Sequence, residues 1–422
     1  MKYHKKVLRN GMRIVVAPMK DNPTVTVMVL VEAGSRYENK RMNGISHFLE
    51  HICFKGTSKR PHSGDISHEL DSLGAESNAF TGDEVTGYWA KGRAHQFDRI
   101  LEIVSDLYLD PLLPKNDITT ERGVIIEELN MYEDLPQRIV HDVLGKLMYK
   151  DQPAGRPIIG PKENLLRFRR PDFITYRNEH YIAPKTTVVV AGNVSVAETE
   201  KKIATYFSHL PKAKYVPRAK TKEHQKTPQL LLKAKKTDQT HFVLGFRSFD
   251  LFDKRIPTLE VLATILGRGM SSRLFRKLRD EMGVCYYVRA GDETSTDTGV
   301  FKIASGVDTK RFEEVLQEIL NQVRRIKNEL VGPVELAKAK EIIMGRTQMG
   351  LESSDDVANW FGEQEILRKK IQTPKEALKE ISAVTAKDVQ KVAREIFRNN
   401  NLNLATVGPV KNTPRLKRIL KV

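Results

Sequence analysis

The stretch "GISHFLEHICFKGT" (residues 44–57) places His47, Glu50 and His51 at helical positions i, i+3 and i+4. On a helix these three side chains share one face. Two imidazoles one turn apart can bind the same zinc ion, because the imidazole nitrogen is a common zinc ligand. The glutamate between them is then placed to take a proton from the attacking water. The spacing therefore indicates a metal-dependent hydrolytic site.

The same residues also fit a buried helix whose histidines form hydrogen bonds inside a core. In that alternative the apolar neighbours pack around them, namely Phe48, Leu49, Ile52 and Phe54. A third ligand separates the two interpretations, since a catalytic zinc has three protein ligands and one open position.

The stretch "TTERGVIIEELNMYED" (119–134) offers this third ligand on a second predicted helix. Glu121 and Glu128 are seven residues apart and share a face, whereas Glu127 points about 100° away from Glu128. Only one of the adjacent pair can face the site. The spacing favours Glu128 as the ligand, with Glu121 behind it as a hydrogen-bonding support. An exposed acidic helix end is the alternative.

The elements that must position these residues occur twice along the chain. Residues 171–194 and 387–410 align without gaps at an offset of 216, each with a helix, a turn and an apolar strand that ends in glycine. Such self-similarity indicates a tandem duplication. We predict an α+β fold of two homologous domains, each an antiparallel-rich sheet with helices packed on one face. The boundaries are 1–210 for the zinc-binding domain, 211–236 for a basic, Pro- and Lys-rich linker and 237–422 for the second domain.

The second half lacks the metal-binding pattern. The offset of 216 carries His47, Glu50 and His51 onto Ala263, Leu266 and Gly267, and no histidine follows His241. We therefore expect one zinc site per chain, with the second domain closing over the first.

Charge and composition narrow the classes of function. The net charge is +17, but much of the excess lies in residues 212–236 and in the tail 411–422, without interleaved aromatic residues. This pattern does not favour nucleic acid as the partner. The chain has no apolar run long enough for a membrane span and no secretory signal at its start. With only Cys53 and Cys285, a reducing compartment is indicated, and we expect a cytoplasmic protein.

Over nearly its whole length the chain resembles the inverted-zincin (H-x-x-E-H) metallopeptidases. These include pitrilysin, insulin-degrading enzyme and the mitochondrial processing peptidase β subunit, and the closest in length are the small bacterial processing proteases. The resemblance rests on His47-Phe-Leu-Glu50-His51 and on the Glu121-Arg pair seven residues before Glu128. It implies His47, His51 and Glu128 as zinc ligands, Glu50 as the general base and Glu121 as support.

Two further stretches match the family. "GAESNAFTGDEVTGYWA" (74–90) resembles its substrate-binding edge strand, which implies that Asn78, Ala79 and Phe80 bind the substrate backbone by strand addition. "SSRLFRKLRDEMGVCYYV" (271–288) resembles the second-half signature, which implies catalytic roles for Arg279 and Tyr286, with Tyr287 as a rival.

The resemblance implies a zinc endopeptidase acting on extended or unfolded peptides inside a dimeric clamshell. The partner would be a second copy or an inactive paralogue, with Arg279 and Tyr286 serving the zinc of the other protomer. The alternative is a catalytically inactive structural or companion subunit of a processing-peptidase-like complex.

Overall fold

The computed structural model of the chain describes residues 1–215 and 217–422. It contains two compact units that each combine pieces of both sequence halves. Unit 1 comprises residues 1–129, 156–219 and 348–373, and unit 2 comprises residues 130–155, 220–347 and 374–422. Two of the divisions fall inside long helices, α4 (Lys115–Glu133) and α12 (Pro333–Met349).

The sheet of unit 1 has six strands in the order β1-β2-β6-β3-β5-β4. All neighbours are antiparallel except β2 and β6, which run parallel. The strands are β1 (His4–Val7), β2 (Arg13–Pro18), β3 (Thr24–Val31), β4 (Glu76–Thr81), β5 (Thr86–Arg93) and β6 (Thr186–Gly192). The helices are α1 (Ile45–Cys53), α2 (Asp65–Ser72), α3 (Phe97–Leu109), most of α4, α6 (Lys162–Arg167), α7 (Arg170–His180), α8 (Val196–Tyr206) and α13 (Ser354–Glu363).

The sheet of unit 2 repeats this plan with five strands in the order β7-β11-β8-β10-β9, where only β7 and β11 run parallel. The strands are β7 (Gln229–Ala234), β8 (Gln239–Ser248), β9 (Cys285–Thr294), β10 (Gly299–Asp308) and β11 (Leu402–Gly408). The helices are α5 (Pro136–Tyr149), α9 (Ile256–Gly267), α10 (Arg273–Phe275) with a π-helical turn over Arg276–Glu281, α11 (Phe312–Asn328), most of α12, α14 (Pro374–Ala383), α15 (Ala386–Ile396) and α16 (Pro414–Ile419).

The duplication predicted from the sequence is present in the elements. Helix α7 and strand β6 map onto α15 and β11 at an offset of 216 at both ends of each element. In each sheet the corresponding strand lies between one parallel and one antiparallel neighbour. The predicted α+β class with two homologous domains is thus confirmed.

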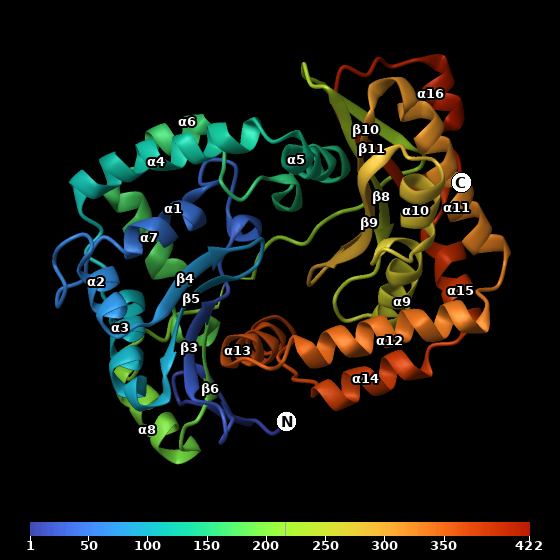
Figure 1. The fold of residues 1–422 in the computed structure, drawn as a ribbon. Coiled ribbons are helices and arrows are strands. Elements are labelled where there is room, and N and C mark those ends of the chain that lie inside the picture. Colours follow the sequence, from blue (N-terminus) through green and yellow to red (C-terminus); the bar gives the residue numbers. More distant parts are fainter. Residues whose placement is uncertain (216) are drawn as a thin grey trace. The chain divides into compact units, whose positions relative to one another are not determined.

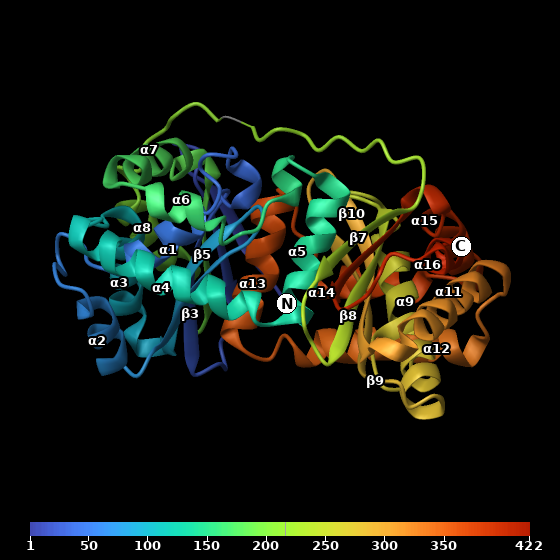
Figure 2. The same ribbon diagram turned by 90° about the horizontal axis from the view of Figure 1, so that it is seen from above.

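The two halves also exchange a helix, which the sequence pattern did not predict. Helix α5, from the first half, packs on β8 and β11 of unit 2, where Val140 and Leu144 join Val243 and Ala405 in one apolar cluster. Helix α13, from the second half, packs on β3 and β6 of unit 1 (Figure 1), with Phe361 among its buried side chains. Figure 2 shows α5 alongside the sheet of unit 2. Each sheet therefore carries one helix on a face that its own half does not cover.

The end of the predicted linker 211–236 differs from expectation. Residues 229–234 form β7, which pairs in parallel with β11, because the run Leu230-Leu231-Leu232 is apolar enough to join a sheet. Val216, inside the same predicted segment, lies outside the described residues.

Candidate metal centre

Helix α1 is held at its start by a buried carboxylate. The side chain of Glu38 accepts hydrogen bonds from the backbone N–H groups of Gly44 and Ser46, both at 2.8 Å. These groups have no partner within the helix, and a negative charge is favoured at a helix N-terminus. Gly44 has φ 100°, and a Cβ there would lie 2.6 Å from the carbonyl oxygen of Ile159. Glycine is therefore required at the entry to this helix.

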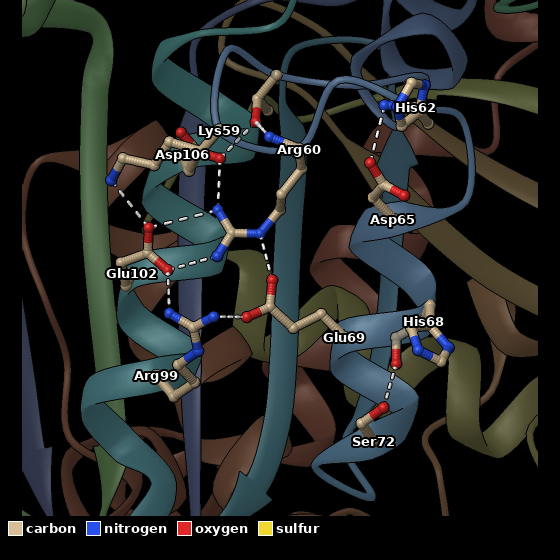
Figure 3. A network of polar contacts seen from close by, with 11 residues as sticks. Lys59, Arg60, His62, Asp65, His68, Glu69, Ser72, Arg99, Glu102 and Asp106 are labelled. Atoms are coloured by element: carbon tan, nitrogen blue, oxygen red, sulfur yellow. Dashed lines mark hydrogen bonds and ion pairs between the residues drawn. The ribbon is translucent and has the colours of Figure 1, made fainter.

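The loop after α1 is fastened by a buried arginine, Arg60. Its guanidinium donates to Glu69 on α2 and to Glu102 and Asp106 on α3, with nitrogen–oxygen distances of 2.5, 2.5 and 2.6 Å (Figure 3). Asp106 also accepts a hydrogen bond from the hydroxyl of Thr57 at 2.5 Å. The network ties the chain immediately after α1 to two further helices of unit 1.

The predicted ligands come together at one point of unit 1. One side-chain atom from each of His47, His51 and Glu128 lies within 4.8 Å of the other two. Glu128 Oε2 is 3.6 Å from His47 Nε2 and 3.7 Å from His51 Nε2. Donor atoms bonded tetrahedrally to one zinc at about 2.1 Å lie about 3.4 Å apart. The donor set and its spacing thus fit a zinc ion.

The structure separates the two adjacent glutamates. Glu127 is exposed, whereas Glu128 is half-buried and faces the two histidines. Helix α4 buries Ile118, Glu121 and Ile125 on one face. Glu128 lies on the same face and is therefore directed toward the site.

Glu121, which the spacing predicted as a hydrogen-bonding support behind Glu128, lies behind His51. Its Oε1 is 2.9 Å from His51 Nδ1, which leaves Nε2 of the same ring directed toward Glu128. Burial would raise the pKa of the Glu121 carboxyl, but the hydrogen bonds from His51 and Lys55 hold it below its usual range. An ionised carboxylate at this position fixes the ring orientation and tautomer of a metal-binding histidine.

The pKa shifts of the neighbouring groups follow from their charges. Burial alone would lower the pKa of His51, but the hydrogen bond to Glu121 and the charges of Glu50, Glu121 and Glu128 raise it. Burial raises the pKa of Glu50, against a hydrogen bond from Thr81 and the charge of His51. A raised carboxyl pKa suits a group that accepts and returns a proton near neutral pH.

Two residues that contact the site, Lys55 and Thr81, were not predicted from the sequence. Lys55 Nζ lies 2.7 Å from Glu121 Oε2, and Thr81 Oγ1 donates to Glu50 Oε2 at 2.5 Å. Lys55 lies in the turn after α1, which ends at Cys53, so helical spacing from His51 does not identify it. No local signal links Thr81 to Glu50, since the contact joins β4 to α1.

The predicted substrate-binding residues lie on β4, the edge strand of the unit 1 sheet. β4 pairs with β5 alone among the described strands. Asn78 and Phe80 are exposed, and Ala79 is half-buried. An edge strand of this kind has backbone groups available for an added strand.

Arg279 and Tyr286 belong to unit 2 and lie together. Arg279 Nη1 donates to the carbonyl oxygen of Tyr286 at 2.8 Å, and the Tyr286 side chain is 78% exposed. Its rival Tyr287 is half-buried, and its hydroxyl is 3.0 Å from His241 Nδ1. Tyr286 is therefore the tyrosine that a ligand can reach more readily.

The fold and the donor set place the chain in the class of two-unit α+β proteins with an H-x-x-E-H metal helix. Residues 13–162 match the model of the insulinase family, peptidase family M16, and residues 167–343 match that of the peptidase M16 inactive domain. The chain belongs to peptidase family M16.

Named relatives agree with this assignment, and a solved structure shares the fold. The chain is 33% identical to the "uncharacterized zinc protease YmxG" of Bacillus subtilis strain 168, over 96% of this chain and 98% of that protein. It is 30% identical to the "uncharacterized zinc protease SCO5738" of Streptomyces coelicolor, over 96% and 89% of the two chains. A protease from Helicobacter pylori has the same fold, with a TM-score of 0.91, 23% identity and coverage of 97% of this chain and 99% of its own.

Within the part of the chain that the structure describes, no helix is both long and apolar enough to cross a membrane.

Proposed function

We propose that this protein is a zinc-dependent endopeptidase that cleaves extended or unfolded polypeptides. The observation that supports this most strongly is the convergence of His47, His51 and Glu128 in unit 1, with Glu50 on the same helix face. The names of the relatives, which are zinc proteases, support the same metal.

His47, His51 and Glu128 would hold the zinc ion, which when bound supplies a Lewis acid that polarises a carbonyl group and lowers the pKa of water. Glu50 accepts the proton of the attacking water and returns it to the leaving amine. The hydrogen bond from Thr81 holds the Glu50 carboxylate in place. Glu121 keeps His51 oriented through the bond at Nδ1.

The substrate would bind in an extended form along β4, at Asn78, Ala79 and Phe80. Strand addition uses backbone hydrogen bonds and so accepts many sequences. Thr81, which contacts Glu50, lies on the same strand, and this link between strand and base supports the assignment of β4.

Arg279 and Tyr286 would assist by binding the peptide and the developing oxyanion. We further propose a dimer, formed with a second copy or with an inactive paralogue, in which these two residues serve the zinc of the other protomer. A mixture of Glu50→Gln and Tyr286→Phe proteins should then recover activity in mixed dimers. Verified subunit exchange without recovery would contradict this part of the proposal.

We also propose that the protein is located in the cytoplasm. Its support is that Cys53 and Cys285 are both buried free thiols, which suits a reducing compartment.

Glu50→Gln provides the main test. Cleavage of a quenched fluorescent peptide mixture should fall by about 10²- to 10⁴-fold, because a positioned general base contributes that much. Zinc content should stay near one ion per chain in both proteins. Zinc binding without cleavage by the wild type would instead indicate a catalytically inactive companion subunit. No zinc after reconstitution would mean that the histidines of α1 serve packing.

A further inference from the structure

Unit 2 contains a pocket of about 800 Å³ that is lined entirely by its own residues. The pocket lies between the end of α9, strands β9 and β10, and the helices α5 and α12. Its charged lining is mainly cationic, with Arg268, Arg289, Lys302 and Arg346 against Asp292 and Glu293. No residue of the candidate metal centre takes part in it.

Two of these cations are neutralised within the pocket. Arg268 Nη2 lies 2.8 Å from Asp292 Oδ1, and Lys302 pairs with Glu293. Because both charges are paired, Arg268 and Lys302 are less available to bind an anion than the other cations of the pocket.

The other two cations, Arg289 and Arg346, are exposed. Among residues 1–215 and 217–422, neither guanidinium has an ion-pair or hydrogen-bond partner. They come from different elements, since Arg289 lies on β9 and Arg346 on α12. The pocket thus holds two planar, permanently charged groups that are available to a ligand.

Three glycines, Gly267, Gly269 and Gly291, are also among the lining residues. A Cβ at Gly269 would lie 3.9 Å from Arg346 Nη2, and one at Gly267 would lie 2.4 Å from the backbone nitrogen of Ala290. Gly267 therefore permits the close approach of α9 to β9 that a side chain would prevent. Nearby, burial is the main cause that lowers the pKa of His141, and the charges of Lys302 and Glu293 act on it in opposite directions.

Strand β9 supplies an open edge beside these arginines. It is the last strand of its sheet and pairs with β10 alone among the described strands (Figure 1). Tyr287, Arg289 and Gly291 alternate along it and line the pocket. An extended chain hydrogen-bonded along this edge would bring its side chains next to Arg289.

We propose that this pocket binds a carboxylate of an extended peptide, held by Arg289 and Arg346. A guanidinium can donate two parallel hydrogen bonds to a carboxylate, and such charge-assisted pairs are stronger than neutral ones. The carboxylate is either an acidic side chain or the C-terminus of the peptide. The choice of a peptide rests on the proposed function, and the pocket adds a preference for acidic substrates.

Binding to the zinc-loaded Glu50→Gln protein tests this without any cleavage step. Fluorescence anisotropy would compare three labelled peptides of one sequence: one with an internal glutamate, one with glutamine in its place, and the glutamate peptide with an amidated C-terminus. We expect the carboxylate in contact to tighten binding about tenfold, equivalent to about 1.4 kcal/mol. A preference for glutamate over glutamine identifies a side chain, and a loss on amidation identifies the C-terminus.

Arg289→Gln and Arg346→Gln should each remove most of this preference, and Arg346→Lys should restore part of it. The matched control is Arg418→Gln, which removes one exposed charge on α16, away from the pocket lining. Equal affinity for all three peptides, or an equal effect of Arg418→Gln, would overturn the inference while leaving the proposed function intact. No binding of any peptide would overturn both.

Discussion

Helices α1 and α9 occupy comparable places in the two halves and differ in what they expose. In α1, His47, Glu50 and His51 are half-buried on one face, while Phe48, Leu49, Ile52 and Cys53 are buried on the other. In α9 every residue from Val261 to Gly267 is buried. A helix that is apolar on all sides is a core element. The helix is therefore present in both halves, whereas the candidate metal ligands are present in only one.

The edge strands differ in a complementary way. β4 of unit 1 carries Asn78 and Phe80 and reaches the candidate base through Thr81. β9 of unit 2 carries Arg289 beside a cationic pocket. One edge contacts the candidate base and the other lies beside fixed positive charge. Under the proposed function, bond cleavage and charge selection would therefore fall to different units.

The largest expected effect comes from removing the predicted zinc ligand of α4, so that this helix, like the second half of the chain, cannot bind the metal. Glu128→Gln should lose zinc. Its affinity for zinc should fall by more than the about 10- to 100-fold that follows loss of a residue that only supports a ligand. Glu127→Gln, the exposed neighbour, is the control and should keep both zinc and activity. Zinc titration with a competing chelator measures the difference. Equal affinity in the two variants would exclude Glu128 as a ligand.

The next effect concerns Lys55, which lies beyond Glu121 from the metal centre. Lys55→Met should weaken zinc binding by about tenfold, because Glu121 loses a partner that keeps it ionised and oriented toward His51. Lys59→Met is the control, since Lys59 is 59% exposed and pairs with Glu102. Chelator competition at several pH values separates this effect from a general loss of stability. If Lys59→Met weakens zinc binding equally, the role of Lys55 is not specific.

A third prediction concerns the stability of unit 1. Arg60→Met would leave the buried carboxylate of Asp106 without its cation, whereas Glu69 and Glu102 would keep Arg99. Breaking a buried charge pair in this way costs about 3–5 kcal/mol, so the midpoint of urea unfolding should fall. Arg415→Met removes a surface pair with Glu313 and should change stability by less than about 1 kcal/mol. Similar midpoints for both variants would show that the Arg60 network adds little.

The smallest effect is a difference in acid sensitivity between the units. His180 is buried, and burial together with the charge of Lys185 lowers its pKa from 6.5 to about 3. At the equivalent position unit 2 has Ile396. Between pH 6.5 and 3 the unfolded chain binds a proton at this histidine that the folded chain does not. Stability contributed by the neutral ring is therefore complete above pH 6.5 and is lost as the pH falls.

His180→Gln should flatten the dependence of the unfolding free energy on pH by up to about 1.4 kcal/mol per pH unit in this range. Glutamine keeps an acceptor for the amino group of Lys185, which lies 3.0 Å from His180 Nδ1. Urea unfolding at pH 7, 6 and 5 measures the slope. His209→Gln, on the surface, is the control, and equal slopes in the two variants would contradict the prediction.

By itself the sequence determined the local features of this protein. Helical spacing put His47, Glu50 and His51 on one face, and the seven-residue interval set Glu128 apart from Glu127, because both follow from the period of a single helix. The duplication was visible for a similar reason, since aligned residues form aligned elements.

Only the tertiary structure decided the long-range features. The exchange of α5 and α13 between the sheets, the contact from Thr81 to Glu50 and the presence of Arg289 and Arg346 in one pocket all bring together residues that are distant in the chain. The apolar faces of α5 and α13 predict burial but do not specify against which sheet. Contacts between distant segments decide against which sheet each helix packs, and the periodicity of the sequence carries no information about those contacts.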